Sequence, residues 1–159
     1  MPVQTFAVTP PGSPADQILN IFGDLVTIKV ASQQTNGKLT VIHSETPPKA
    51  GPPLHRHLSD SETFFVLEGE FLFVLNDEAV AVSAGSTVFI PAGTRHQYQN
   101  VGNEPGKLLI ILEPAGLDAF FIELDHLLKQ SAEPDMPAVA ALHAKFGMEL
   151  LGPPLAALG

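Results

Sequence analysis

Three histidines and one glutamate stand at spacings that would let them bind one metal ion together. His55 and His57 are separated by a single residue, so in a β-strand their side chains point to the same side. Glu62 follows five residues after His57, and His96 ends a second window, residues 91–96. Three imidazoles and a carboxylate suit a divalent transition metal with open positions, and Fe, Mn, Ni, Zn, Cu and Co are all compatible. We predict one such ion per chain.

Five further side chains are candidates to line the pocket around this cluster. They are Tyr98, Phe64, Phe73, Phe89 and His43. Tyr98 stands two residues after His96, so strand alternation turns it to the same interior, where its hydroxyl could bind a substrate or a backbone group. The phenylalanines would make the pocket apolar, although phenylalanine in a barrel usually serves core packing. His43 either supports the ligands by hydrogen bonding or lies half-exposed on a sheet face.

The same pattern places other basic side chains outside the pocket. Arg56 and Arg95 alternate away from the predicted ligands, so we expect them at the solvent or at an interface. His126 and His143 fall in predicted helices, and we expect them on the surface or at an interface as well.

Short strands separated by turns must position these residues. Between residues 24 and 113 the sequence has about eight short runs with turn residues every 8–12 positions, which is typical of a β-sandwich or barrel. Asn36-Gly37 between two β-branched runs predicts a hairpin, and Glu68-Gly69 predicts another turn. Gly69 and Gly85 fall where a positive φ is often needed.

The two ends of the chain differ from this central part. Four prolines in residues 1–17 predict an arm, which we assign to residues 1–23, before a β-barrel over residues 24–115. Residues 116–159 are predicted as a helical extension, with a second helix over residues 138–150. The first part of this extension has an apolar stripe that begins at Leu117. The stripe predicts that the helix packs on the barrel or on a dimer partner, or that it forms a lid over the barrel mouth.

The two windows that hold the predicted ligands resemble the cupin family. The first cupin motif corresponds to His55, His57, Glu62 and Gly69 with its spacing intact. The second motif is complete and corresponds to Gly85, Pro91, Gly93, His96 and Asn100. Lys49 stands where the family has a glycine before the first histidine, and Gly51 lies close by. The resemblance covers residues 38–113, and two motifs in the right order are far more specific than one.

The resemblance implies an all-β fold, the cupin-type double-stranded β-helix or jelly-roll barrel, here followed by C-terminal α-helices. It implies a metal inside the barrel on His55, His57, Glu62 and His96, and a structural role for Asn100 at a strand end. The runs GPPLHRHLSDSETFFVLEGEF and FGMELLGPPL are similar to small single-domain cupins described as quercetin-dioxygenase-like. In that subgroup the metal holds an enolic substrate beside dioxygen, and the glutamate acts as ligand and as catalytic base.

The expected function is therefore that of a metal-dependent dioxygenase acting on a small enolic, aromatic or diketone-like substrate, with Glu62 as the catalytic residue. Two alternatives remain open at this point. One is a cupin that binds a metal and a small ligand without turnover, and the other is a metal-dependent isomerase or epimerase.

Composition excludes several other classes of protein. The chain has 159 residues and a formal net charge of −9, and its few basic residues form no patch for nucleic acid. Cysteine is absent, which removes thiol catalysis and disulfides. The longest apolar run, residues 108–112, is too short for a membrane helix, and the N-terminus lacks a secretory pattern. We expect a cytoplasmic protein that binds a small molecule and forms a homodimer.

Overall fold

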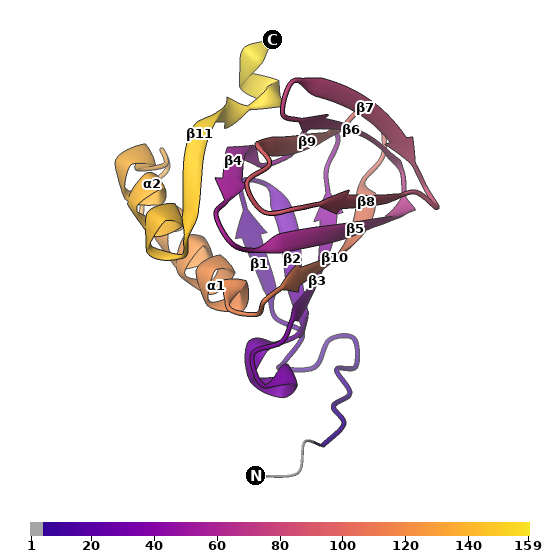
Figure 1. Cartoon of the computed structure of the whole chain (residues 1–159), viewed down its shortest axis with the longest axis vertical. Helices are drawn as coiled ribbons and strands as arrows, with labels where there is room; N and C mark the ends of the chain where they lie inside the picture. Colours follow the sequence, from indigo (N-terminus) through magenta and orange to yellow (C-terminus); the bar gives the residue numbers. More distant parts are fainter. Residues whose placement is uncertain (1–4) are drawn as a thin grey trace.

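Two antiparallel sheets face each other in the computed structural model of the chain, which describes residues 5–159 (Figure 1). The larger sheet contains, in spatial order, β1 (Ile18–Ile21), β2 (Asp24–Val30), β3 (Thr40–Thr46), β10 (Gly106–Glu113), β5 (Ser61–Glu68) and β8 (Thr87–Ile90). The smaller sheet contains β11 (Met148–Pro154), β4 (Pro53–His57), β9 (His96–Asn100), β6 (Glu70–Leu75) and β7 (Glu78–Ser83). The predicted all-β jelly roll with C-terminal α-helices is confirmed.

Strand alternation creates an interior that is not uniformly apolar. In β10 every second residue is buried, and these residues include Leu108, Ile110 and Leu112. In the neighbouring β3 the inward residues are mostly hydroxyl-bearing and include Ser44 and Thr46, both fully buried. One part of the barrel interior is therefore lined by aliphatic side chains and another carries polar groups that need hydrogen-bond partners.

The predicted turns are present, although one of them connects different sheets. Asn36 and Gly37, with φ of 53° and 80°, lie in the connection between the paired strands β2 and β3. Gly69, with a φ of 91°, joins β5 in one sheet to β6 in the other. This glycine therefore turns a corner of the barrel instead of closing a hairpin.

The predicted division into arm, barrel and helical extension stays a prediction, but the structure adds one strand to the sheets from each end of the chain. Residues 1–4 lie outside the described residues, but β1 belongs to the larger sheet, where it pairs with β2. At the other end β11 pairs with β4, so the segment after the helices returns to the barrel. Both are edge strands, where proline is tolerated, and each is too short or irregular for its periodicity to be recognised. The described residues hold eleven strands, and nine of them lie within residues 24–113, where about eight were predicted.

Two helices cover one side of the barrel beside β1 and β11 (Figure 1). They are α1 (Leu117–Leu128) and α2 (Met136–Lys145), and α2 is shorter than predicted because the chain turns at Gly147, whose φ is 72°. The buried Asp125 of α1 accepts a hydrogen bond of 2.8 Å from the backbone N–H of Asn20 in β1. The apolar stripe of α1 thus packs on the barrel of its own chain.

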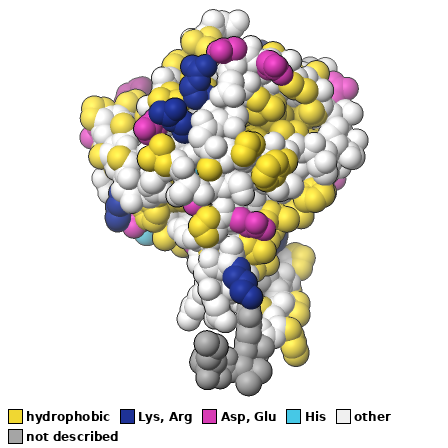
Figure 2. Space-filling model, viewed as in Figure 1, with side chains coloured by type: hydrophobic (Ala, Val, Ile, Leu, Met, Phe, Trp, Pro, Cys, Tyr) yellow, Lys and Arg dark blue, Asp and Glu magenta, His cyan; other side chains and the backbone are white. Residues whose placement is uncertain are grey.

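The outer face of the larger sheet carries exposed hydrophobic side chains. Phe65 and Leu67 of β5 and Phe89 of β8 are exposed, and Figure 2 shows hydrophobic side chains gathered over this part of the surface. The expected homodimer stays a prediction. None of the helices in residues 5–159 is long and apolar enough to cross a membrane.

Candidate metal centre

The histidine pair lies on β4, a strand whose start is fixed by close backbone packing. A Cβ atom on Gly51 would lie 1.8 Å from the carbonyl oxygen of Tyr98, so only glycine fits at this approach. Lys49, which stands at the family's glycine position, adopts a positive φ of 68°. Within β4 the side chains of His55 and His57 point to the same side, as predicted, and His55 pairs with His96 of β9.

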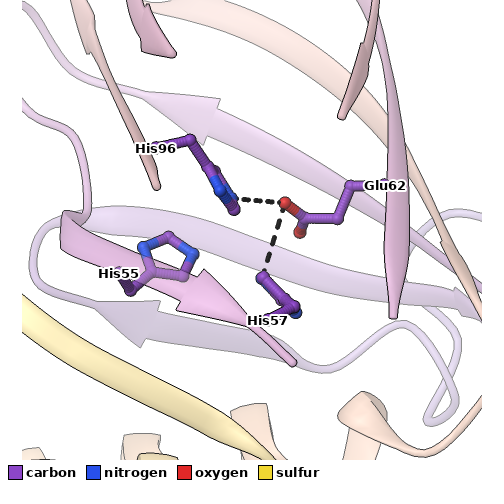
Figure 3. Close-up of side chains that lie close together, drawn as sticks. All are labelled: His55, His57, Glu62 and His96. Carbon is purple, nitrogen blue, oxygen red and sulfur yellow. Dashed lines mark ion pairs between the residues drawn. The ribbon is translucent and has the colours of Figure 1, made fainter. Parts of the chain in front are cut away.

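The other two side chains of the cluster reach it from different directions. The turn before His96 is held by Gly93, whose φ is 88° and whose N–H donates to the carbonyl of His57 at 2.7 Å. Glu62 lies on β5, in the opposite sheet, because the chain bends after His57 and crosses between the sheets. Three imidazoles of one sheet therefore face one carboxylate of the other, as Figure 3 shows.

The four side chains offer their donor atoms to a common point. One donor atom from each residue lies within 4.8 Å of the others. Glu62 Oε2 is 2.7 Å from His96 Nε2 and 3.5 Å from His57 Nε2, the contacts drawn in Figure 3. His57, Glu62 and His96 are buried, with exposed fractions of 4%, 6% and 2%. The structure thus brings together all four residues that the sequence selected.

Hydrogen bonds to backbone carbonyls fix which ring nitrogens face the cluster. Nδ1 of His55 lies 2.8 Å from the carbonyl oxygen of Pro53, and Nδ1 of His96 lies 2.9 Å from that of Thr94. A carbonyl oxygen only accepts, so Nδ1 carries the proton in both rings and Nε2 presents a lone pair. Such outer hydrogen bonds are the usual way of orienting metal-binding histidines.

The charges of the cluster are coupled. Burial, followed by the proximity of His96 and His57, holds the pKa of His55 well below its ordinary 6.5. Burial would lower the pKa of His57 as well, but the carboxylates of Glu62 and Asp60 together outweigh it and raise that pKa. For Glu62, burial favours the protonated form, but the nearby imidazoles prevail and lower its pKa to about 2. Glu62 is therefore a carboxylate at neutral pH.

The unsatisfied atoms of the cluster fit a metal ion. His57 Nε2, His96 Nε2 and Glu62 Oε2 are all buried and lack a partner in hydrogen-bond geometry. Leaving several such atoms unpaired costs roughly 1–3 kcal/mol each. Because their lone pairs converge, a single divalent cation would satisfy all of them at once. The buried cluster is a candidate metal site, and its donor types leave the identity of the ion open.

The cluster opens into a cavity of about 70 Å³ between the two sheets and the helices. Its walls are mainly apolar and come from every layer of the fold. They include Ile21, Val26, Ile42, Phe64, Ile110, Leu117, Phe120, Phe121, Leu124 and Met148. The helices therefore close the barrel interior above the cluster.

Two of the five predicted pocket residues line this cavity, and one lies just behind it. Tyr98 and Phe64 are lining residues, and Tyr98 is buried with only 6% of its surface exposed. Phe73 is fully buried and packs its ring 5.2 Å from that of Phe64 and 5.4 Å from that of Tyr98. It belongs to the aromatic core that supports the wall.

The prediction for Phe89 is wrong. Phe89 is 64% exposed, because Val88 and Ile90 are the inward residues of β8. His43 takes the second of its two predicted positions. It lies between the inward residues Ile42 and Ser44 of β3, so its side chain is on the outer face of the sheet.

His143 was also misplaced by the sequence interpretation. It is buried, with 4% exposed, and it lines the cavity, with its ring 6.2 Å from that of His55. Its Nδ1 lies 2.8 Å from the carbonyl oxygen of Val139, one turn earlier in α2. The shared helical face with buried Val139 is the signal that would have found it. His126, in contrast, is exposed as predicted.

The supporting residues behave as the motifs imply. Nδ2 of Asn100 donates to the carbonyls of Thr46 and Glu104, each at 2.8 Å, which confirms its structural role at a strand end. Arg56 and Arg95 turn away from the cluster and bind Glu149 and Asp77, respectively.

Comparison with known proteins agrees with this geometry. Residues 42–112 match the family described as cupin domain. Residues 42–112 of the chain are thus similar to the cupin domain. In fold, the chain resembles the structure of KdgF from Halomonas sp., with a TM-score of 0.63 at 16% identity over 72% of this chain and 99% of the other.

Curated relatives match only part of the chain. An uncharacterized protein of Methanocaldococcus jannaschii is 39% identical over 38% of this chain and 49% of its own. Quercetin 2,3-dioxygenase of Bacillus subtilis is 29% identical over 59% of this chain and 28% of its own. An oxalate-binding protein of Thermotoga maritima is 32% identical over 42% of this chain and 54% of its own. The chain thus spans about half or less of the length of these relatives.

Proposed function

We propose that this protein is a metal-dependent dioxygenase that acts on a small, enolisable carbonyl compound of the diketone type. The observation that carries the proposal is that His57 Nε2, Glu62 Oε2 and His96 Nε2 are buried without a partner in hydrogen-bond geometry beside a mainly apolar cavity. The 29% identity to quercetin 2,3-dioxygenase over 94 residues supports the same class of reaction.

The size of the cavity favours a substrate smaller than a flavonol. Sites for drug-sized ligands enclose about 300–1,000 Å³, whereas a single water needs roughly 10–15 Å³. The cavity of about 70 Å³ therefore suits a compound of a few heavy atoms. Neither lysine nor arginine occurs among its lining residues in the described part of the chain, which favours a neutral substrate.

The residues of the cluster would hold the ion and prepare the site for one orientation of the substrate. The chemistry that a divalent ion supplies when bound here is Lewis-acid activation of an enol oxygen. Backbone acceptors keep the Nε2 atoms of His55 and His96 directed at the site, and the apolar walls exclude bulk water. Glu62, with its pKa lowered to about 2, is a stronger candidate for ligand than for base, since an effective base titrates near the working pH.

Metal content and oxygen uptake test this proposal. Protein purified without added metal is analysed for its elements, then loaded in turn with Fe, Mn, Ni, Co and Cu. We expect oxygen consumption with small diketones and little with flavonols. The His57→Ala variant serves as the control without a complete cluster. A metal-loaded protein that consumes no oxygen with any member of the panel contradicts the dioxygenase proposal.

Binding without turnover is the second candidate, and the similarity to an oxalate-binding protein favours it. Calorimetry with oxalate separates the two functions. Lysine and arginine are absent from the described cavity lining, so no side chain of the lining would offset the charge of oxalate. We therefore expect weak oxalate binding, through the metal ion alone. Tight oxalate binding together with no oxygen uptake would favour the binding function.

A further inference from the structure

A second polar group faces the same cavity, away from the histidine cluster. Asp24 at the start of β2 is buried, with 4% exposed, and lines the cavity. Its Oδ2 accepts a hydrogen bond of 2.7 Å from the hydroxyl of Tyr98. Its other oxygen, Oδ1, is buried and has no hydrogen-bond partner. A buried carboxylate oxygen of this kind requires a donor.

The surroundings of Asp24 supply hydroxyls but no positive charge. Burial raises the pKa of Asp24, while the hydroxyls of Thr46, Tyr98 and Ser44 lower it. Ser44 and Thr46, however, hydrogen-bond to each other at 3.1 Å, and neither reaches Oδ1 in hydrogen-bond geometry. Neither lysine nor arginine lines the described cavity. No donor of the described residues reaches Oδ1 in hydrogen-bond geometry, which leaves this oxygen available to an occupant of the cavity.

We propose that Asp24 Oδ1 accepts a hydrogen bond from a hydroxyl group of the ligand, whose opposite end binds at the histidine cluster. The cavity then selects a short compound with a metal-binding oxygen at one end and a hydroxyl donor at the other. This deepens the proposed function, on which it rests for the presence of a metal. The small volume of about 70 Å³ limits the carbon spacer to a few atoms.

Matched hydroxamic acids test the proposal, because a hydroxamate binds a metal ion at one end. The protein is loaded with Zn²⁺, which has no redox chemistry. Calorimetry compares propanohydroxamic acid with its 3-hydroxy derivative, and butanohydroxamic acid with its 4-hydroxy derivative. We expect at least one hydroxylated compound to bind about tenfold more tightly than its partner, the gain typical of a hydrogen bond to a charged group.

Two variants locate the effect. Asp24→Leu removes both carboxylate oxygens, and we expect the hydroxyl advantage to disappear. Asp77→Leu is the matched control, since Asp77 is exposed at the surface and pairs with Arg95. It should keep the tenfold advantage. Thermal unfolding shows whether Asp24→Leu folds, and the comparison of compounds on the unsubstituted protein decides the question without it.

Equal binding of both members of each pair overturns the role of Asp24 and indicates that a water satisfies Oδ1. Failure of all four hydroxamic acids to bind overturns the proposed ligand class together with the metal site. A clear hydroxyl advantage without oxygen uptake on any substrate supports the inference and removes only the dioxygenase proposal.

Discussion

The two sides of the cavity come from different parts of the chain. The four side chains of the cluster lie within residues 55–96, inside the segment that matches the cupin family. The covering wall comes from α1, α2 and the neighbouring strands β1, β2 and β11, outside that segment. The side with the cluster has metal-binding residue types at fixed spacings in the sequence. The covering wall has ordinary apolar patterns, and its buried polar side chains include Asp24 and His143. The proposed metal binding and the proposed ligand selection thus depend on different parts of the sequence.

Removing one ligand of the cluster should have the largest effect. His57→Ala leaves the lone pairs of Glu62 and His96 without a common partner, and metal content should fall from about one ion per chain to background. Elemental analysis after dialysis measures it. His43→Ala is the matched control, because His43 lies on the outer face of β3, and it should retain the metal. Equal loss in both variants would mean that the metal binds elsewhere.

Lowering the pH should release the metal nearly as completely as the His57→Ala substitution does. The imidazoles must be neutral to bind, and the pKa of His57 is raised above its ordinary 6.5 because Glu62 and Asp60 together outweigh its burial. As the pH falls through that raised pKa, protons compete with the metal, and the apparent affinity should drop by about tenfold or more per unit. Metal titration between about pH 8 and pH 5 measures this.

The carboxylate gives the pH experiment its internal check. Because the pKa of Glu62 is lowered to about 2, this ligand stays charged over the whole range. The release should therefore follow imidazole protonation alone. An apparent metal affinity that stays constant between about pH 8 and pH 5 contradicts the assignment.

The residues of the cluster could be predicted from the sequence more completely than those of the covering wall. The positions of His55, His57, Glu62 and His96 were recoverable, because strand alternation and two motifs constrain them. Asp24 was not, since a lone acidic side chain at the start of a strand has no spacing to mark it. His143 has only one weak signal, its helical spacing from Val139. Their burial depends on how β1, α2 and β11 close over the barrel, a tertiary arrangement that local periodicity does not encode.

Opening the covering wall should reduce stability but leave the metal in place. Phe120 of α1 is 4% exposed and packs its ring 4.9 Å from that of His143 and 5.7 Å from that of Phe146. Phe120→Ala should lower the free energy of unfolding by about 3–5 kcal/mol and enlarge the cavity. Denaturant unfolding measures the first effect, and turnover of bulkier diketones measures the second. Ile122→Ala, at an exposed position of the same helix, is the control.

The smallest effect is expected from substituting Arg56, the neighbour of His57 on β4. Arg56 lies between the two histidines of β4, yet its guanidinium turns outward and its Nε donates to Glu149 of β11 at 2.9 Å. The side chains of Arg56 and Glu149 are 36% and 40% exposed, so solvent screens the pair, and its coupling should be about 1 kcal/mol or less. A double-mutant cycle with Arg56→Gln and Glu149→Gln measures it, and both variants should keep a full complement of metal. Loss of metal in either variant would show that the edge strand β11 holds the histidine pair in place, and the two sides of the cavity would then not be separable.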